Sequence, residues 1–429
     1  MKNTQKKRRG FFMKKNTQNK WKSFGKMSAL AFLMAGAVLF TSACGMRVSA
    51  AELTAGYSRR VSADSTPDDA FLASLNAFSF DLWQQTLEKD GENHLFSPLS
   101  AALCLGMLSR GADGQTKAEF EQMFGVDMDT FARGMLSYVS GLYTDKNCHV
   151  ALADSLWIKE GFSVKDSFLQ DSVDYFDAQV YRTTMDDSTV KDINAWVRKN
   201  TDGLIDKIYD SMDAQTVMVL INSLLFDAKW ETKYEKSNIS PMRFTAYDGT
   251  VTQKDALHSE EHTYLKAEDV VGFAKNYEGG AYSFVGLLPV DEDADIYDFA
   301  ATLTAEKWQA LWNSRMGKTV NVSMPEFSFA DEIKLNDPLV RLGLSSVFDS
   351  SAANLAGMTD EDVFCSEVAQ KTFIQVDRNG TKAAAITWED VNTTAMREEY
   401  SVVLNRPFVC AIVDNATGLP LFLSVVASV

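Results

Sequence analysis

The sequence predicts a mixed α+β fold, with helices concentrated in the first half of the chain and strands in the second. Apolar residues recur three and four positions apart in several segments before residue 211, which is the spacing of a helix with one buried face. From residue 217 onward, short runs dense in apolar residues indicate strands that are covered on both faces. Because helices mostly precede strands instead of alternating with them, the order favours several sheets over repeated βαβ units.

The helical spacing and the apolar runs define ten expected elements. Helices are expected at 70–85, 99–109, 117–124 and 189–210. Strands are expected at 217–225, 282–288, 320–324, 372–376, 408–413 and 421–426. No Pro-, Gly- or Ser-rich linker divides the chain after residue 65, so residues 66–429 are expected to form one large domain.

The first fifty residues differ in composition from the rest of the chain. They contain 11 Lys or Arg and no acidic residue, whereas the remaining chain contains 31 basic and 58 acidic residues, a formal charge of −27. The basic start is followed by the apolar stretch 29–40, which is too short to span a bilayer, and then by small residues. This order is typical of an export signal, so residues 1–50 are excluded from the fold and residues 51–65 are expected to be a polar spacer.

Two processing sites remain open. Val48-Ser49-Ala50 suits a signal peptidase, whereas Thr41-Ser42-Ala43-Cys44-Gly45 resembles a lipoprotein box without its usual Leu, in which Cys44 would carry a lipid that tethers the protein to a membrane. Either product lies outside the cytoplasm, secreted or held at the cell surface. The strongly acidic mature chain disfavours nucleic acid and anionic membranes as ligands.

Four cysteines follow the leader: Cys104, Cys148, Cys365 and Cys410. An even number in an exported chain permits disulfides, but four is sparse for this length, and no pair has the spacing of metal ligands. Cys104 lies in an apolar helical run and Cys410 in a buried-strand pattern. Both are therefore expected to be buried thiols.

Signals for catalysis are few. The chain contains four histidines and no Gly-x-Ser-x-Gly elbow, phosphate-binding Gly loop or dense patch of basic and aromatic residues. One pattern does fit, since His258, Glu261 and His262 have the H-x-x-E-H spacing of zinc hydrolases, in which both His face a metal from one helical turn. The flanks 251–254 and 263–266 lack the apolar face of a buried helix, so neither an enzyme nor a metal or other cofactor is expected.

The most informative feature is a run of small residues near the C-terminus, Gly380-Thr381-Lys382-Ala383-Ala384-Ala385. It leads through the polar segment 387–399 to Arg406-Pro407-Phe408. Small side chains without a Pro can pass from a loop into a sheet without displacing their neighbours, which makes the run a candidate moving part. The alternative is an ordinary exposed crossover.

These residues resemble the serpins, whose reactive loop begins with a Gly-Thr-Glu-Ala-Ala-Ala hinge and leads to a strand carrying Arg-Pro-Phe. Further similar segments follow in the family's order at 93–114, 193–197, 220–230, 324–327 and 342–344, so the resemblance covers roughly residues 66–429. It implies an α+β fold of about nine helices packed on three β-sheets, with an exposed reactive-centre loop at about 378–403. Residues 193–197 are similar to the segment that enters the large central sheet.

The resemblance implies a monomeric suicide inhibitor of serine proteases, whose loop is cleaved and then enters the central sheet while the protease stays covalently attached. Family spacing puts the reactive bond at Thr394-Ala395, which suits an elastase-like protease and is favoured over Met396-Arg397, which suits a trypsin-like one. The chain has no basic patch of the kind that binds heparin, so no polyanion partner is expected. A non-inhibitory serpin that binds a ligand or partner is the alternative, favoured by Arg378, Lys382 and Glu389.

Insertion would turn alternate loop residues inward: Thr381, Ala383, Ala385, Thr387, Glu389 and Val391. Five of these six side chains suit burial. Glu389 does not, because a buried carboxylate is costly unless it is paired or protonated.

By resemblance, two groups of residues lie along the path of the loop. Four are expected beneath the centre of the sheet, the shutter: Ser97, Ser100, Asn222 and Gln370. Three are expected at its upper end, the breach: Trp230, Glu326 and Arg378. Arg378 and Glu326 stand where serpins usually have Glu and Lys, so an ion pair of reversed polarity is expected between them. Gln370 replaces a His and is expected to bond Asn222 and Ser97 without titrating near neutral pH.

Overall fold

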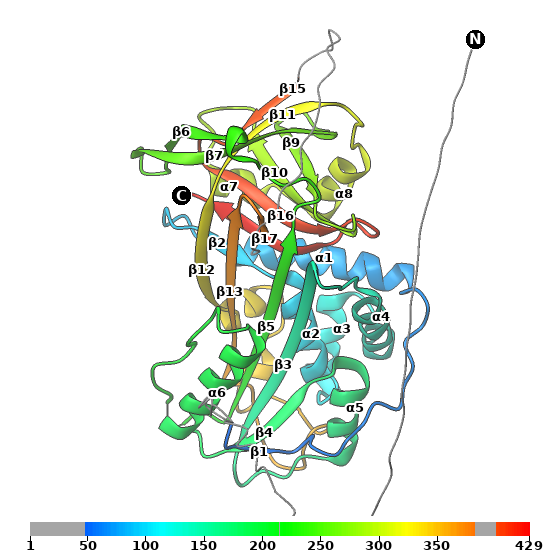
Figure 1. Cartoon of the computed structure of the whole chain (residues 1–429). Helices are drawn as coiled ribbons and strands as arrows, with labels where there is room; N and C mark the ends of the chain where they lie inside the picture. The colour runs from blue at the N-terminus through cyan, green and yellow to red at the C-terminus, as the bar shows by residue number, and fades with distance from the viewer. Residues whose placement is uncertain (1–47, 214, 382–399) are drawn as a thin grey trace, which may run out of the picture. The chain divides into compact units, whose positions relative to one another are not determined.

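The computed structural model describes residues 48–213, 215–381 and 400–429. These residues form nine α-helices and three β-sheets (Figure 1), which confirms the predicted α+β class. The helices are α1 (Asp69–Thr86), α2 (Pro98–Ser109), α3 (Gly114–Phe124), α4 (Met128–Gly141), α5 (Asp166–Phe176), α6 (Asp187–Asn200), α7 (Ile296–Ala301), α8 (Ala305–Asn313) and α9 (Asn336–Arg341).

The largest sheet, here called the central sheet, has seven strands. In spatial order they are β1 (Ala51–Glu52), β4 (Gln179–Thr183), β3 (Cys148–Lys159), β5 (Met218–Lys229), β14 (Gly380–Thr381), β13 (Glu367–Asp377) and β12 (Phe327–Lys334). Helix α2 packs on one face of β3 and β5, and α6 packs on the other face. β5 is therefore buried over most of its length, as the dense apolar run at 217–225 predicted, and β3 is buried at 154–158.

Two smaller sheets lie at the other end of the fold (Figure 1). The second sheet has the order β2 (His94–Phe96), β17 (Pro420–Val426), β16 (Phe408–Asp414), β10 (Tyr282–Pro289), β9 (Val270–Asn276) and β8 (Thr263–Lys266). The third has the order β15 (Tyr400–Val403), β11 (Val320–Pro325), β7 (Val251–Glu261) and β6 (Ile239–Thr245). Every residue of β10, β16 and β17 is buried, which confirms three of the strands predicted as covered on both faces.

Helix α2 is a buried helix that packs against the central sheet. Ser97 caps its N-terminus and Pro98 occupies the first turn, where the missing N–H of a proline is not needed. All of its residues are buried, because α1, α4 and α5 surround the sides that the sheet leaves free. A Cβ at Gly106 would lie 2.8 Å from Phe131 and from Phe176, so only glycine permits this close packing.

Helix α6 ends earlier than the sequence predicted. The expected helix 189–210 stops at Asn200, and the chain then turns through Asp202 and Gly203, both in the left-handed region with φ of 49° and 76°. The apolar residues beyond the turn still face the sheet, because the Asn194 side chain accepts from the backbone N–H groups of Ile208 and Tyr209 and folds this segment back against α6. Residues 193–197 accordingly lie within a helix that covers the sheet and do not lead into a strand.

The segment expected to be a polar spacer contacts the body of the fold. Residues Ala51 and Glu52 form β1, which pairs with β4 at the edge of the central sheet. Just before it, the backbone N–H groups of Ser49 and Ala50 each donate to the Asp192 carboxylate over 2.8 Å. The same segment therefore closes one edge of the sheet, which a short strand can do without exposing a long unpaired edge.

Candidate functional site

The central sheet parts between β5 and β13. The two strands pair directly, in parallel, over four positions that end at Asn222 and Gln370. At the upper end β14 lies between them, with Thr381 opposite Ala228 on one side and Val376 on the other. Among the described residues, β5 and β13 have no direct pairing between these two points. We call this interval the slot and the row at Asn222 and Gln370 the fork.

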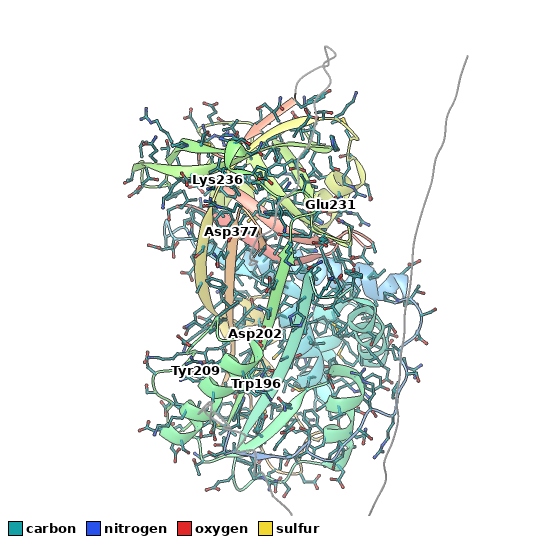
Figure 2. All side chains as sticks on the ribbon, in the orientation of Figure 1. Trp196, Asp202, Tyr209, Glu231, Lys236 and Asp377 are labelled. Atoms are coloured by element: carbon teal, nitrogen blue, oxygen red, sulfur yellow. The ribbon has the colours of Figure 1, made fainter. Side chains whose placement is uncertain are left out.

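The hinge strand β14 already occupies the mouth of the slot. A Cβ on Gly380 would lie 2.1 Å from the backbone oxygen of Ala228, so only glycine allows this approach. The Asp377 carboxylate accepts from the backbone N–H groups of Asn379 and Gly380, which shapes the turn from β13 into β14. Figure 2 labels Asp377 in this upper part of the central sheet.

The first inward side chain of the loop is held in place. Thr381 is 3% exposed, and its hydroxyl lies 2.6 Å from the hydroxyl of Tyr277. The Tyr277 ring stacks on Trp230 with centroids 4.7 Å apart. Burial raises the pKa of Tyr277 well above its usual value, so its hydroxyl keeps a proton to share with Thr381. The sequence did not single out Tyr277, because it lies in β-rich sequence far from the hinge.

The predicted ion pair at the breach is confirmed. Arg378 Nε lies 3.0 Å from Glu326 Oε1, and its terminal nitrogen lies 3.1 Å from Oε2. The backbone N–H of Arg378 also donates to Glu326 Oε1 over 3.0 Å. Hydrogen bonding to Glu326 raises the pKa of Arg378, so the guanidinium group remains charged at every physiological pH. Because the Arg378 side chain is 41% exposed, the pair contributes about 0 to 1 kcal/mol.

A buried ion pair beside Trp230 was not anticipated. Lys275 is 2% exposed, its ammonium group lies 4.7 Å from the ring centroid of Tyr234 and 5.5 Å from that of Trp230, and it bonds Glu261 over 2.7 Å. The Trp230 indole in turn donates to the backbone oxygen of Asp377 over 2.8 Å. These contacts hold the Trp230 side chain in place next to the hinge.

The zinc-hydrolase alternative does not fit the structure. His258 and Glu261 lie in the extended strand β7, whereas the motif needs both His on one helical turn. The two ring nitrogens of His258 bond the hydroxyl groups of Ser323 and Ser240, each over 2.8 Å, and Glu261 is engaged by Lys275. Among the described residues, no three His, Cys, Asp or Glu side chains are grouped to hold a metal ion.

At the shutter, Gln370 bonds Ser97 as expected. The backbone N–H of Ser97 donates to Gln370 Oε1 over 2.8 Å, and Gln370 Nε2 donates to the Ser97 carbonyl over 2.9 Å. These two hydrogen bonds connect β13 to the start of α2. Ser100 lies one turn further along α2 and is fully buried, but its hydroxyl has no partner among the described residues.

The expected bond between Gln370 and Asn222 is absent from the described residues. The Asn222 amide instead donates to Asp154, a neighbour on β3 that the sequence reading overlooked. Burial raises the pKa of Asp154 to about 8. One signal was available, because Asp154 is an acid within the otherwise apolar run 151–158.

Some of the remaining expectations can be compared with the structure, and others concern residues outside its described part. Cys104 and Cys410 are confirmed as buried thiols, and Cys148 and Cys365 are buried and free as well. The following residues named from the sequence lie outside the described part of the chain: Cys44, Lys382 to Ala385, Thr387, Glu389, Val391, Thr394-Ala395 and Met396-Arg397. Among the described helices, none is both long and apolar enough to cross a membrane.

Comparisons with known proteins point to one family. A family model described as serpin (serine protease inhibitor) matches residues 73–429. Human neuroserpin is 30% identical over 380 residues, which cover 83% of this chain and 90% of neuroserpin. An uncharacterized serpin-like protein of Thermococcus kodakarensis is 26% identical over 361 residues, which cover 82% of this chain and 84% of that protein.

Solved structures agree with this. The crystal structure of a thermophilic serpin, tengpin, in the native state is 36% identical with a TM-score of 0.85, and the match covers 89% of this chain and 100% of that one. Tengpin in the latent state has the same identity and a TM-score of 0.76, with 85% of this chain and 100% of that one covered.

Proposed function

Because this chain belongs to the serpin family, whose members are generally protease inhibitors, we propose that it is an exported suicide inhibitor of serine proteases. A protease cleaves the reactive loop and forms an acyl bond to it. The loop then fills the slot between β5 and β13 and carries the protease with it. The observation that supports this most is the position of Gly380 and Thr381, which are already paired with both strands at the mouth of the slot.

The register at the mouth defines the proposed inserted strand. Thr381 is opposite Ala228 of β5 and Val376 of β13, and β14 is antiparallel to both strands. Each step forward along the loop therefore corresponds to one step backward along β5 and along β13. Thr387 would then lie opposite both Asn222 and Gln370. These two residues are themselves partners at the fork, so the registers on the two sides of the slot agree.

This register divides insertion into two stages. Residues 382–386 would fill the slot without breaking any pairing between β5 and β13 among the described residues. From Thr387 onward, each further step would separate the four directly paired positions. Glu389 would arrive between Leu220 and Val368, which are 0% and 1% exposed, so the one inward acid would meet an apolar layer at the third of these four positions.

The reactive bond is proposed at Thr394-Ala395, which suits an elastase-like protease, with Met396-Arg397 as the second candidate. Incubation with an elastase-like and with a trypsin-like protease, followed by denaturing electrophoresis, tests the proposal. An inhibitor gives a complex that survives the detergent, and sequencing the released peptide identifies the bond. Complete cleavage of the loop by both proteases without any complex would contradict it, and cleavage only after Arg397 would contradict the elastase preference.

A non-inhibitory serpin that binds a ligand or partner is the second candidate. The observation that favours it is the apolar row of Leu220 and Val368, which Glu389 would have to enter. Cleavage without a complex, together with an unchanged thermal stability after cleavage, would support this candidate, because insertion of a strand should stabilise the fold.

We propose a membrane-tethered product over a freely secreted one. Asp192 is 5% exposed, and its carboxylate accepts hydrogen bonds from the backbone N–H groups of Ser49 and Ala50 and from the Ser49 hydroxyl. A cut after Ala50 would remove all of these donors. Cleavage before Cys44, with lipid on that cysteine, retains both residues. The intact mass of the exported protein distinguishes the two. The acidic mature chain, without a basic patch, is proposed to act as a monomer, without polyanion or nucleic acid partners.

A further inference from the structure

A buried carboxyl group lies in the row of residues that forms the fork. Asp154 of β3, Asn222 of β5 and Gln370 of β13 are register partners across the central sheet, and each is only 2–3% exposed. Above this row, β5 and β13 have no direct pairing within the described residues. Asp154 is therefore one strand away from the point where the sheet parts.

The hydrogen bonds within this row are incomplete. Asn222 Nδ2 donates to Asp154 Oδ1, but Asp154 Oδ2 and Asn222 Oδ1 have no partner among the described residues. Three acceptor oxygens therefore share one amide donor group. A proton on Asp154 supplies the missing donor, because a carboxylic acid and a carboxamide side by side can exchange two hydrogen bonds.

The surroundings of Asp154 do not favour its charged form. On α2 it faces the thiol of Cys104, which is neutral because burial raises the pKa of that thiol well above its usual value. Its neighbours on β5 and β13 are the uncharged amides Asn222 and Gln370. On β4 the charged residue Arg182 lies opposite a position four residues further along β3, and α6 covers the other face of the sheet.

The pKa of Asp154, raised by burial to about 8, agrees with this geometry. It lies above the value of 3.8 for an unperturbed aspartate, so the folded chain keeps a proton that the unfolded chain releases. The stabilisation that comes from this proton is therefore full below about pH 4 and is lost progressively as the pH rises to about 8.

We propose that Asp154 is a proton-dependent latch of the central sheet, whose neutral carboxyl group holds β3 and β5 together at the fork. Loss of the proton leaves a buried carboxylate that needs water, and the slot is the nearest route for it. β5 and β13 then separate more readily in mildly alkaline solution. The latch belongs to the closed sheet and does not require that the protein inhibit a protease.

Hydrogen exchange of the full exported chain tests the latch. Peptides covering 218–229 and 367–377 are compared at pH 7 and pH 9, after correction for the faster chemical exchange at high pH. In the unmodified protein we expect about tenfold less protection at pH 9, because opening releases the proton and so becomes about ten times easier for each pH unit up to the pKa of about 8, and then levels off. Asp154→Asn, which keeps the shape and the paired hydrogen bonds of the neutral acid, should keep its protection at both pH values.

Glu332→Gln is the matched control, since Glu332 lies in β12 of the same sheet but is partly exposed and pairs with Lys371. It should retain the pH dependence of the unmodified protein. The same loss of protection in Asp154→Asn and in Glu332→Gln would overturn the proposal. Infrared spectra of the unmodified protein give a second measurement that does not depend on a variant. The carbonyl band of a protonated carboxyl group should disappear between pH 7 and 9. Absence of this band at pH 7 would also overturn the proposal.

Discussion

The hydroxyl groups of Tyr277 and Thr381 lie 2.6 Å apart, so the first inward side chain of the reactive loop is already bound within the central sheet. Tyr277 comes from β-rich sequence more than a hundred residues earlier, and its ring stacks on Trp230. The hinge is thus anchored at one end of the slot while the fork closes the other. In the proposed mechanism, this arrangement would separate the start of insertion from its completion.

Replacing Tyr277 with Phe should release the hinge. The variant loses the hydrogen bond to Thr381 and leaves that hydroxyl without its partner, at a cost of about 1 kcal/mol. We expect faster hydrogen exchange in β14, by roughly fivefold, and a modest decrease in thermal stability. Tyr143→Phe, which removes a hydroxyl that bonds Asp145 at the surface, is the control. Unchanged exchange in β14 would show that Tyr277 does not hold the hinge.

Replacing Gly380 with Ala should expel β14 from the mouth of the slot. The added Cβ would lie 2.1 Å from the backbone oxygen of Ala228 and 2.7 Å from the Cα of Lys229, and these backbone atoms of β5 have little room to move. We expect the loop to be cleaved as an ordinary substrate, so that several-fold more protein is consumed for each protease inactivated. Gly317→Ala is the control, because a Cβ there has no neighbour within 4 Å. Normal inhibition by Gly380→Ala would contradict the geometry of the mouth.

The two partners at the breach should differ in their effect on stability. Arg378→Ala removes the side-chain ion pair but keeps the backbone N–H of residue 378, which still donates to Glu326. The substitution Arg378→Ala should lower the free energy of unfolding by about 0 to 1 kcal/mol. Glu326→Ala removes both interactions and should lower the free energy of unfolding by about 1 kcal/mol more than Arg378→Ala does. Chemical unfolding of the two variants measures this difference, and equal effects would mean that the backbone bond contributes nothing.

Glu389→Ala should make inhibition more efficient. Removing the inward carboxylate removes the cost of burying it between Leu220 and Val368, so fewer inhibitor molecules should be consumed for each protease inactivated. The unmodified protein should also improve at lower pH, where Glu389 gains a proton more easily. Glu399→Ala is the control, since this acid follows both candidate reactive bonds and would not be part of the inserted strand. An equal effect of both substitutions would point to loop charge and not to burial.

Local sequence pattern was a good guide where a structural element depends on neighbouring residues. The apolar runs located the strands of the protein interior, and the small residues Gly380 and Thr381 form a short strand within the central sheet. The exchanged charges of Arg378 and Glu326 predicted their contact, because two opposite charges at matched positions of a known fold have few other partners. The helix expected to reach residue 210 was too long, because its apolar spacing continues after Asn200 in a loop that packs on the same surface.

The sequence by itself determined the α+β class, the buried strands, the charge division of the chain and the run of small residues at 380–385, since all of these are properties of composition and short-range spacing. Only the tertiary structure decided that Asn222 bonds Asp154 and not Gln370, that Lys275 lies between the Tyr234 and Trp230 rings, and that Ser49 and Ala50 bond Asp192. These contacts join segments far apart in the chain. A shift of one residue in strand register would turn each of these side chains to the opposite face, and that register is set by the packing of the whole sheet.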